Sequence, residues 1–242
     1  MATKDSETAT SPGTARSAAR LYRTSVGKKL VMAGSGIVLF AYVVGHMVGN
    51  LKAFQGPEAF NDYAIWLRET GTPAVPEYGI VWAVRIILLL AVVAHITTAV
   101  QLWRQSRAAR PQGYRQEQSL VFSYASRTMR WGGVIIAAFV IYHILHLTVG
   151  AAHPEFEYGQ VYCNVVIGFQ NPLVVAFYVV AVGALSLHLY HGLWSATQTL
   201  AAIHPKYERL RRPVALAVAL IIFIGFVSVP LSVQAGVLTL PG

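Results

Sequence analysis

The chain has 242 residues, of which 55% are hydrophobic and only 12% are charged, and its mean hydropathy is +0.51. Soluble domains carry about 25% charged residues, so this balance excludes an ordinary soluble domain and indicates an integral membrane protein. The net charge of +9 does not indicate nucleic-acid binding. The basic residues lie in short runs at the ends of apolar segments, where they act as orientation signals in membrane lipid.

Five apolar segments are long enough to cross a bilayer, because about 20 apolar residues span about 30 Å of hydrocarbon. We therefore predict an all-α integral membrane bundle of five transmembrane helices, formed by one domain over residues 25–242. Residues 1–24 are small and polar and lack the apolar stretch of a signal peptide, so they predict a disordered cytoplasmic tail. The predicted helices cover about residues 29–50, 80–103, 129–150, 172–196 and 213–233.

Lys and Arg residues are distributed unevenly along the chain. The flank before the first segment and the second and fourth connections together hold sixteen of them, whereas the first connection holds two. Cytoplasmic loops carry an excess of Lys and Arg, so we predict a cytoplasmic N-terminus and an outer C-terminus.

Two connections carry features of their own. The first contains an amphipathic stretch beginning at Pro57, which predicts a short interfacial helix with Phe60, Ala64 and Leu67 on one side. The third contains the single cysteine, Cys163, which we assign to a loop and which cannot form an internal disulfide.

Six of the eight histidines lie inside the predicted spans. Ionisable groups at membrane depth are costly and mark functional sites that face the bundle interior, although any single one could instead be an interhelical hydrogen bonder. His153 and His204 lie beside prolines in the connections, where we expect them to be solvated. The six histidines within the spans are His46, His95, His143, His146, His188 and His191.

Depth sorts these six histidines into two levels. At about 1.5 Å per residue, the histidines of the first and third segments fall in the outer half of the membrane, and those of the second and fourth fall in the inner half. Facing imidazoles at each level are what two stacked bis-histidine haems require. Zinc fits less well, because the spans contain no Asp or Glu. A histidine relay in a proton or metal transporter is an alternative.

Glycines near the histidines would let a flat macrocycle lie close to the backbone, with ordinary helix packing as their alternative role. The chain has no phosphate-binding glycine loop, so we expect any flavin or nicotinamide chemistry to belong to a partner. The glycines in question are Gly34, Gly36, Gly45, Gly49, Gly132, Gly133, Gly183 and Gly192.

Four stretches around the histidines carry a family resemblance. They are TSVGKKLVMAGSG and GHMVGN at residues 24–36 and 45–50, His95, WGG and YHILH within residues 131–146, and HLYHGLW at residues 188–194. Together they resemble the four ligand-bearing helices of the cytochrome b membrane anchor of succinate:quinone oxidoreductases. The resemblance is to the single-chain, five-helix, di-haem branch, shared with some quinol:fumarate reductases, and it runs from about residue 23 to the fifth helix.

The resemblance implies two haem b groups, each with two axial histidine ligands. The residues alone leave two choices open, because His146 matches the depth of His46 and His191 shares a helix face with His188. The family's spacing favours the earlier histidine of each pair. The implied iron ligands are His46 and His143 for the outer haem, and His95 and His188 for the inner haem.

The resemblance also implies a bacterial respiratory complex in the cytoplasmic membrane. Its partners would be an iron–sulfur subunit and a flavoprotein subunit with FAD, which oxidises succinate in the tricarboxylic acid cycle. This chain would be the electron-transfer subunit that reacts with menaquinone. The candidate proton-site residues are Glu58, Asp62, Glu69 and Glu77, and Glu69 is preferred because the corresponding loop of the family carries an acidic residue. Arg85, in the second helix, is the candidate quinone-site residue, with snorkelling to the membrane interface as its alternative role. A homo-oligomer of the complex, another quinone-linked dehydrogenase and a fumarate reductase stay open.

Overall fold

The computed structural model describes residues 20–109, 120–199 and 205–241, and over these residues the chain is all-α. Its five long helices are each long and apolar enough to cross a bilayer. The predicted five-helix transmembrane bundle is therefore confirmed, and the protein is a multi-pass membrane protein. The long helices are α2 (Ser25–Asn50), α4 (Gly79–Ala108), α5 (Leu120–Ile144), α7 (Pro172–Thr199) and α8 (Arg211–Gln234).

Several helices extend beyond the predicted bounds. Helix α2 begins at Ser25 rather than at about residue 29, because the Thr24 side chain caps it by accepting a hydrogen bond from the Gly27 backbone N–H (3.0 Å). An apolar stretch marks only the part of a helix that crosses hydrocarbon, and the hydrogen-bonded backbone continues into the polar interface. Of the predicted disordered tail, residues 1–19 lie outside the described residues, and residues 20–23 are helical rather than disordered.

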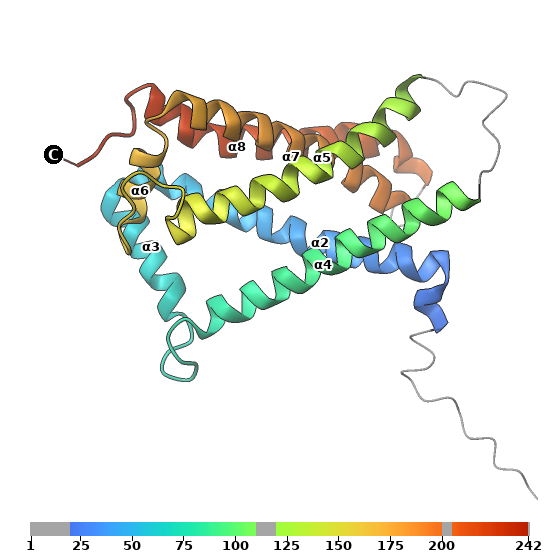
Figure 1. Ribbon diagram of the computed structural model, residues 1–242, viewed down its shortest axis with the longest axis horizontal. Helices are drawn as coiled ribbons and strands as arrows, with labels where there is room; N and C mark the ends of the chain where they lie inside the picture. The colour runs from blue at the N-terminus through green and yellow to red at the C-terminus, as the bar shows by residue number, and fades with distance from the viewer. Residues whose placement is uncertain (1–19, 110–119, 200–204, 242) are drawn as a thin grey trace, which may run out of the picture.

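Two short helices, α3 (Pro57–Glu69) and α6 (Val161–Gly168), pack against each other at one end of the bundle, where the C-terminus also lies (Figure 1). We call this the α3–α6 end, and the opposite end, where α2 begins, the N-terminal end. The Tyr162 backbone N–H on α6 donates a hydrogen bond to the Asn61 side chain on α3 (3.1 Å). The two helices thus form a cap over the bundle.

The sequence predicted α3 but not α6. Helix α3 begins at Pro57 as expected, and Phe60 is buried, but Leu67 is 39% exposed, so the predicted apolar side is correct only for its first part. Cys163 lies in α6 rather than in a loop. An apolar run of eight residues is too short for its periodicity to identify a helix.

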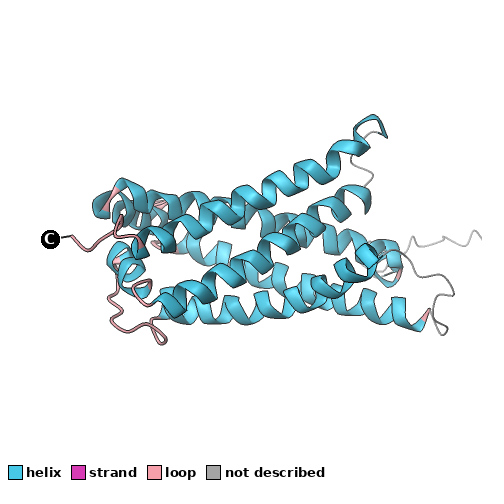
Figure 2. Cartoon of the chain, turned by 90° about the horizontal axis from the view of Figure 1, so that it is seen from above, coloured by secondary structure: helices cyan, strands magenta, loops and turns pink. Residues whose placement is uncertain are grey.

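The long helices run along a common direction (Figure 2) but do not all pack against one another. Helix α7 packs along α8, α2 packs against α4 and α8, and α5 packs against α7. In contrast, neither α2 and α5 nor α4 and α7 make extensive backbone contact. Side chains that face each other between these last two helix pairs therefore meet across a wider spacing.

The buried side chains concentrate at the α3–α6 end. One apolar cluster joins both cap helices to three of the long helices, and includes Phe60, Phe139, Tyr162, Tyr178 and Val229. Towards the bilayer the surface is apolar, as on α4, where Leu89 and Leu90 are each 64% exposed. An apolar outer surface is expected in a bilayer, because apolar side chains that contact lipid carry no energetic cost.

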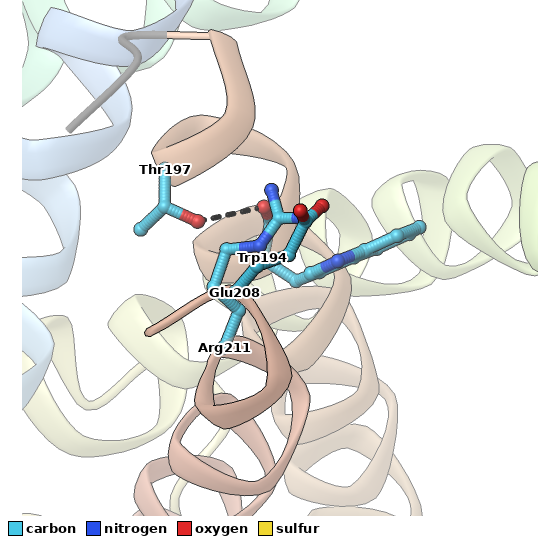
Figure 3. Close-up of polar contacts among 4 residues, drawn as sticks. All are labelled: Trp194, Thr197, Glu208 and Arg211. Carbon is cyan, nitrogen blue, oxygen red and sulfur yellow. Dashed lines mark hydrogen bonds and ion pairs between the residues drawn. The ribbon is translucent and has the colours of Figure 1, made fainter. Parts of the chain in front are cut away.

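At the N-terminal end, local polar contacts lie at the end of α7 and at the start of α8 (Figure 3). The Arg211 guanidinium forms an ion pair with Glu208 in the short 3₁₀ helix η3 (Pro205–Leu210). The Thr197 hydroxyl donates to the Trp194 backbone carbonyl (2.9 Å), and the Arg212 guanidinium lies over the Trp194 ring (4.8 Å). The Arg212–Trp194 contact thus links α7 to α8 at this end of the bundle.

Candidate functional site

Two of the predicted site histidines, His46 on α2 and His143 on α5, face each other. Their ring centroids lie 5.7 Å apart with the planes at 82°. Tyr42 stacks on the His46 ring at 5.3 Å, and Phe226 lies 5.9 Å from it, while Phe139 lies 5.7 Å from the His143 ring. This pair is therefore enclosed by aromatic rings.

The other two, His95 on α4 and His188 on α7, face each other at 6.2 Å with the ring planes at 65°. Ser35 on α2 lies 3.2 Å from His95 Nδ1, and the Ser35 hydroxyl donates to the Val31 carbonyl (2.7 Å). The Ser35 oxygen is then the acceptor for a proton on His95 Nδ1, which leaves the lone pair on Nε2. The ring also lies beside Gly36 of α2, where a Cβ would make an ordinary contact with His95 Cε1 at 3.5 Å.

The two pairs lie at different depths in the bundle. His46 follows Ser35, the contact of the other pair, by eleven residues along α2, which corresponds to about 16 Å at 1.5 Å per residue. On α7, Tyr178, which lies 3.4 Å from His143, precedes His188 by ten residues, or about 15 Å. Both helices therefore give the same separation.

His146 belongs to a different cluster from His46 and His143. It is 1% exposed, its Nδ1 lies 2.9 Å from the Tyr178 hydroxyl, and its ring lies 5.3 Å from that of His153. A Cβ on Gly168 of α6 would lie only 3.0 Å from His146 Nε2. Of the two histidines near the end of α5, it is His143 that the fold brings to His46.

Of the two histidines on α7, His188 rather than His191 faces His95. The ring of His191 lies against its neighbour Tyr190 at 5.0 Å, whereas His188 faces His95. His188 Nδ1 is buried without a hydrogen-bond partner among the described residues. A buried unsatisfied nitrogen costs about 1–3 kcal/mol unless a further group satisfies it.

The expectation that His153 is solvated is wrong. Its ring is half-buried, its Nε2 donates to the Asn164 backbone carbonyl (2.8 Å), and its Nδ1 accepts from the Glu155 backbone N–H (3.0 Å). Asn164 lies on α6, so the environment of His153 depends on a helix that the sequence did not reveal. His204, the other histidine expected to be solvated, lies outside the described residues.

Within the described residues, no hydrogen bond or ion pair joins either candidate quinone-site residue to a histidine of the two pairs, but Arg85 lies within electrostatic range of Tyr42, which stacks on His46. Glu69 ends α3 with an exposed side chain, and its backbone carbonyl accepts a hydrogen bond from the Thr72 hydroxyl (2.8 Å). Arg85 is exposed on α4, with its guanidinium over the Trp82 ring (5.0 Å). Within the described ranges, no hydrogen bond or ion pair joins Glu69 to Arg85.

The spacing of both histidine pairs fits one metal ion between each pair of rings. With a metal–nitrogen bond of about 2 Å, two imidazoles on opposite sides of one ion place their ring centroids about 6 Å apart. The observed values are 5.7 and 6.2 Å. No group of three or more His, Cys, Asp or Glu side chains converges anywhere in the described part of the chain, so each pair offers a metal two imidazole nitrogens and no third protein ligand of these types.

The eight glycines predicted to lie near the histidines differ in how much space surrounds them. Gly36, Gly49 and Gly183 serve ordinary packing, because a Cβ on each would contact a protein side chain. The other five of the predicted set have no atom within 4 Å of a Cβ position, which leaves room for a flat group or for lipid. These five are Gly34, Gly45, Gly132, Gly133 and Gly192.

No protein-family model, curated protein or solved structure matches this chain. Its function is therefore inferred from its own residues and their geometry.

Proposed function

We propose that this protein is the di-haem cytochrome b membrane anchor of a succinate:quinone oxidoreductase. The observation that carries the proposal is the pair of facing imidazoles at each of two depths in a transmembrane bundle. A histidine that serves only as an interhelical hydrogen bonder has no requirement for a second imidazole about 6 Å away. The motifs that surround these histidines support the assignment to the succinate family.

The four histidines would hold two haem b groups by axial ligation alone. His46 and His143 come from helices without extensive backbone contact, as do His95 and His188, so each pair can hold a flat group between its helices. Each haem, when bound, supplies reversible one-electron chemistry. Two histidines per iron leave no axial position for oxygen, which favours electron transfer over ligand chemistry.

The basic N-terminal end would face the cytoplasm. Lys28 and Lys29 near the start of α2, Arg104 and Arg107 at the end of α4, and Arg212 on α8 all lie towards this end, as expected for a cytoplasmic face. In this orientation the C-terminus is outside. The iron–sulfur subunit and the FAD-bearing flavoprotein would dock on this face, and succinate oxidation would occur on them, in the cytoplasmic membrane of a bacterial cell.

Menaquinone would react at the α3–α6 end, near the level of His46 and His143. Glu69 and Arg85 are exposed on elements at this end, so each could meet a quinone that arrives from the lipid. Glu69 would exchange protons with the outer water, and Arg85 would hydrogen-bond the quinone or neutralise a haem carboxylate.

The test is a dithionite-reduced minus oxidised spectrum of the chain purified with its native partners, combined with a pyridine haemochrome assay. We expect two haems b per chain. His46→Ala and His95→Ala should each remove a different one, and the matched variant His191→Ala should retain both. Absence of haem from the wild-type complex would refute the proposal. If the haems are reduced by an electron donor other than succinate, the protein is still a cytochrome b, but it belongs to a different dehydrogenase complex.

A further inference from the structure

We propose that Tyr178 is a positioning residue that sets the orientation and electron donation of His143, and that His146 holds the Tyr178 hydroxyl in place. This inference rests on the proposed function, because it takes His143 as an iron ligand. It assigns a role to two buried polar side chains at the α3–α6 end that haem ligation itself does not use.

The Tyr178 hydroxyl lies between two imidazoles. It is 2.9 Å from His146 Nδ1 and 3.4 Å from His143 Nδ1. The ring of Tyr178 is only 5% exposed and is held edge-on by Phe169 at 4.8 Å and Phe139 at 5.0 Å. A tyrosine enclosed in this way cannot turn its hydroxyl towards water.

Ligation of a metal fixes the direction of these hydrogen bonds. If His143 binds iron through Nε2, its Nδ1 carries a proton and donates it to the Tyr178 oxygen. The Tyr178 hydroxyl then donates its own proton to His146 Nδ1, and the His146 ring keeps its proton on Nε2. His143 Nδ1–H and the Tyr178 hydroxyl then each have one acceptor, and no charge is created, as a buried polar network at membrane depth requires.

His146 is itself fixed by the cap. Tyr142 stacks on its ring at 5.4 Å, and Gly168 of α6 closes its other side, since even a Cβ there would come within 3.0 Å. The neighbouring His153 uses both ring nitrogens for backbone groups. Helix α6 thus determines, through His146 and Tyr178, how the ring of His143 is held.

The other histidine pair has no such arrangement. His95 lies against the Ser35 oxygen and the Met32 backbone, and His188 Nδ1 has no hydrogen-bond partner among the residues that the structure describes. A hydrogen bond from the remote ring nitrogen makes a histidine a stronger electron donor to its metal. The Tyr178 hydroxyl should therefore lower the reduction potential of the haem between His46 and His143, and leave the second haem unaffected.

The experiment compares Tyr178→Phe with Tyr162→Phe in the purified holo-complex. Both remove a buried tyrosine hydroxyl from the same apolar cluster, but the Tyr162 hydroxyl donates to the Thr239 carbonyl (3.1 Å) and lies outside the proposed chain. Haem content, a potentiometric titration and the low-spin ferric EPR spectrum are measured for each. In Tyr178→Phe we expect an upward shift of one haem potential and a change in one EPR signal. Tyr162→Phe should match the wild type.

A second pair of variants covers the case in which Tyr178→Phe does not assemble. His146→Leu removes the acceptor of the Tyr178 proton, whereas His146→Asn retains a side-chain oxygen as acceptor. We expect His146→Leu to shift the same haem in the same direction, and His146→Asn to shift it less.

Wild-type potentials and EPR signals in Tyr178→Phe would overturn the inference. Equal shifts in Tyr178→Phe and Tyr162→Phe, equal shifts of both haems, or no difference between the two His146 variants would also overturn it. All these outcomes require that wild-type haem be present. They are therefore distinct from failure of the proposed function, which would show as absence of haem from the wild type.

Discussion

The two histidine pairs present the same donor atoms in different surroundings. The His46–His143 pair lies beside the main apolar cluster, among Tyr42, Phe139 and Phe226, and below the cap formed by α3 and α6. The His95–His188 pair lies nearer the N-terminal end, which has few buried side chains. The first pair is held by packing and the second mainly by one serine, so a change in one region should affect one haem and not the other.

The comparison also shows what the cap contributes. Helices α3 and α6 add no predicted ligand, yet they provide Phe60, Tyr162 and Val166 to the buried cluster. Well-packed neighbours hold a ligand in one orientation, and that precision determines how well a site performs. We expect the His46–His143 haem to depend on the cap and the His95–His188 haem to be independent of it.

The largest expected effect comes from removing a ligand. His143→Ala should eliminate the haem at the α3–α6 end, and His188→Ala should eliminate the other, because each leaves an iron with one protein ligand. Haem per chain should fall from two to one in both variants, measured by pyridine haemochrome. Reduced-minus-oxidised spectra should show that different haems remain. Loss of the same haem from both variants would contradict the two-level arrangement.

The next effect concerns the cap. Phe60→Ala removes a side chain that is 5% exposed in the central cluster, and such a truncation costs about 3–5 kcal/mol. On heating, the variant should lose the spectrum of the His46–His143 haem at a lower temperature than the wild type, while the second haem behaves as before. Trp66→Ala on the same helix is the control, since Trp66 is 58% exposed. Equal loss of both haems would show that the levels are not independent.

A smaller effect is expected at the contact of α6 with His146. In Gly168→Ala the new methyl would lie 3.0 Å from His146 Nε2 and 3.1 Å from His153 Nε2, and overpacking of this kind costs about 1–3 kcal/mol. The EPR signal of the His46–His143 haem should change, because His146 must move. Gly183→Ala, where a Cβ would lie 3.8 Å from Phe223, should leave the signal as it is. An unchanged Gly168→Ala spectrum would argue against transmission through α6.

The smallest effect is expected at the His95–His188 pair. Ser35→Ala removes the acceptor of the His95 Nδ1 proton, a net loss of about 0.5–1.5 kcal/mol for one hydrogen bond. The potential of this haem alone should rise slightly in a redox titration. Ser228→Ala, which removes a similar serine that donates to the Gly225 carbonyl on α8 (2.8 Å), should alter neither potential. A shift of the His46–His143 haem in Ser35→Ala would contradict the separation of the levels.

Local properties of the sequence were enough to predict much of this architecture. Long apolar runs specify transmembrane helices because the bilayer admits few other structures, and so the five spans were correct. Pro57 indicated the start of α3 because proline is favoured in the first helical turn. The approximate depth of each histidine also followed from the sequence, because a helix rises by a fixed amount per residue.

Only the tertiary structure decided which side chains meet. It brought His143 rather than His146 to His46, because α5 ends at Ile144 and His146 lies in the π-helical turn Leu145–Val149, where it meets Tyr178 instead. It also joined His146, from the turn after α5, and His153, from a loop, with Tyr178 on α7 and Asn164 on α6. Such contacts depend on how separate helices pack, and no period or spacing within one segment carries that information.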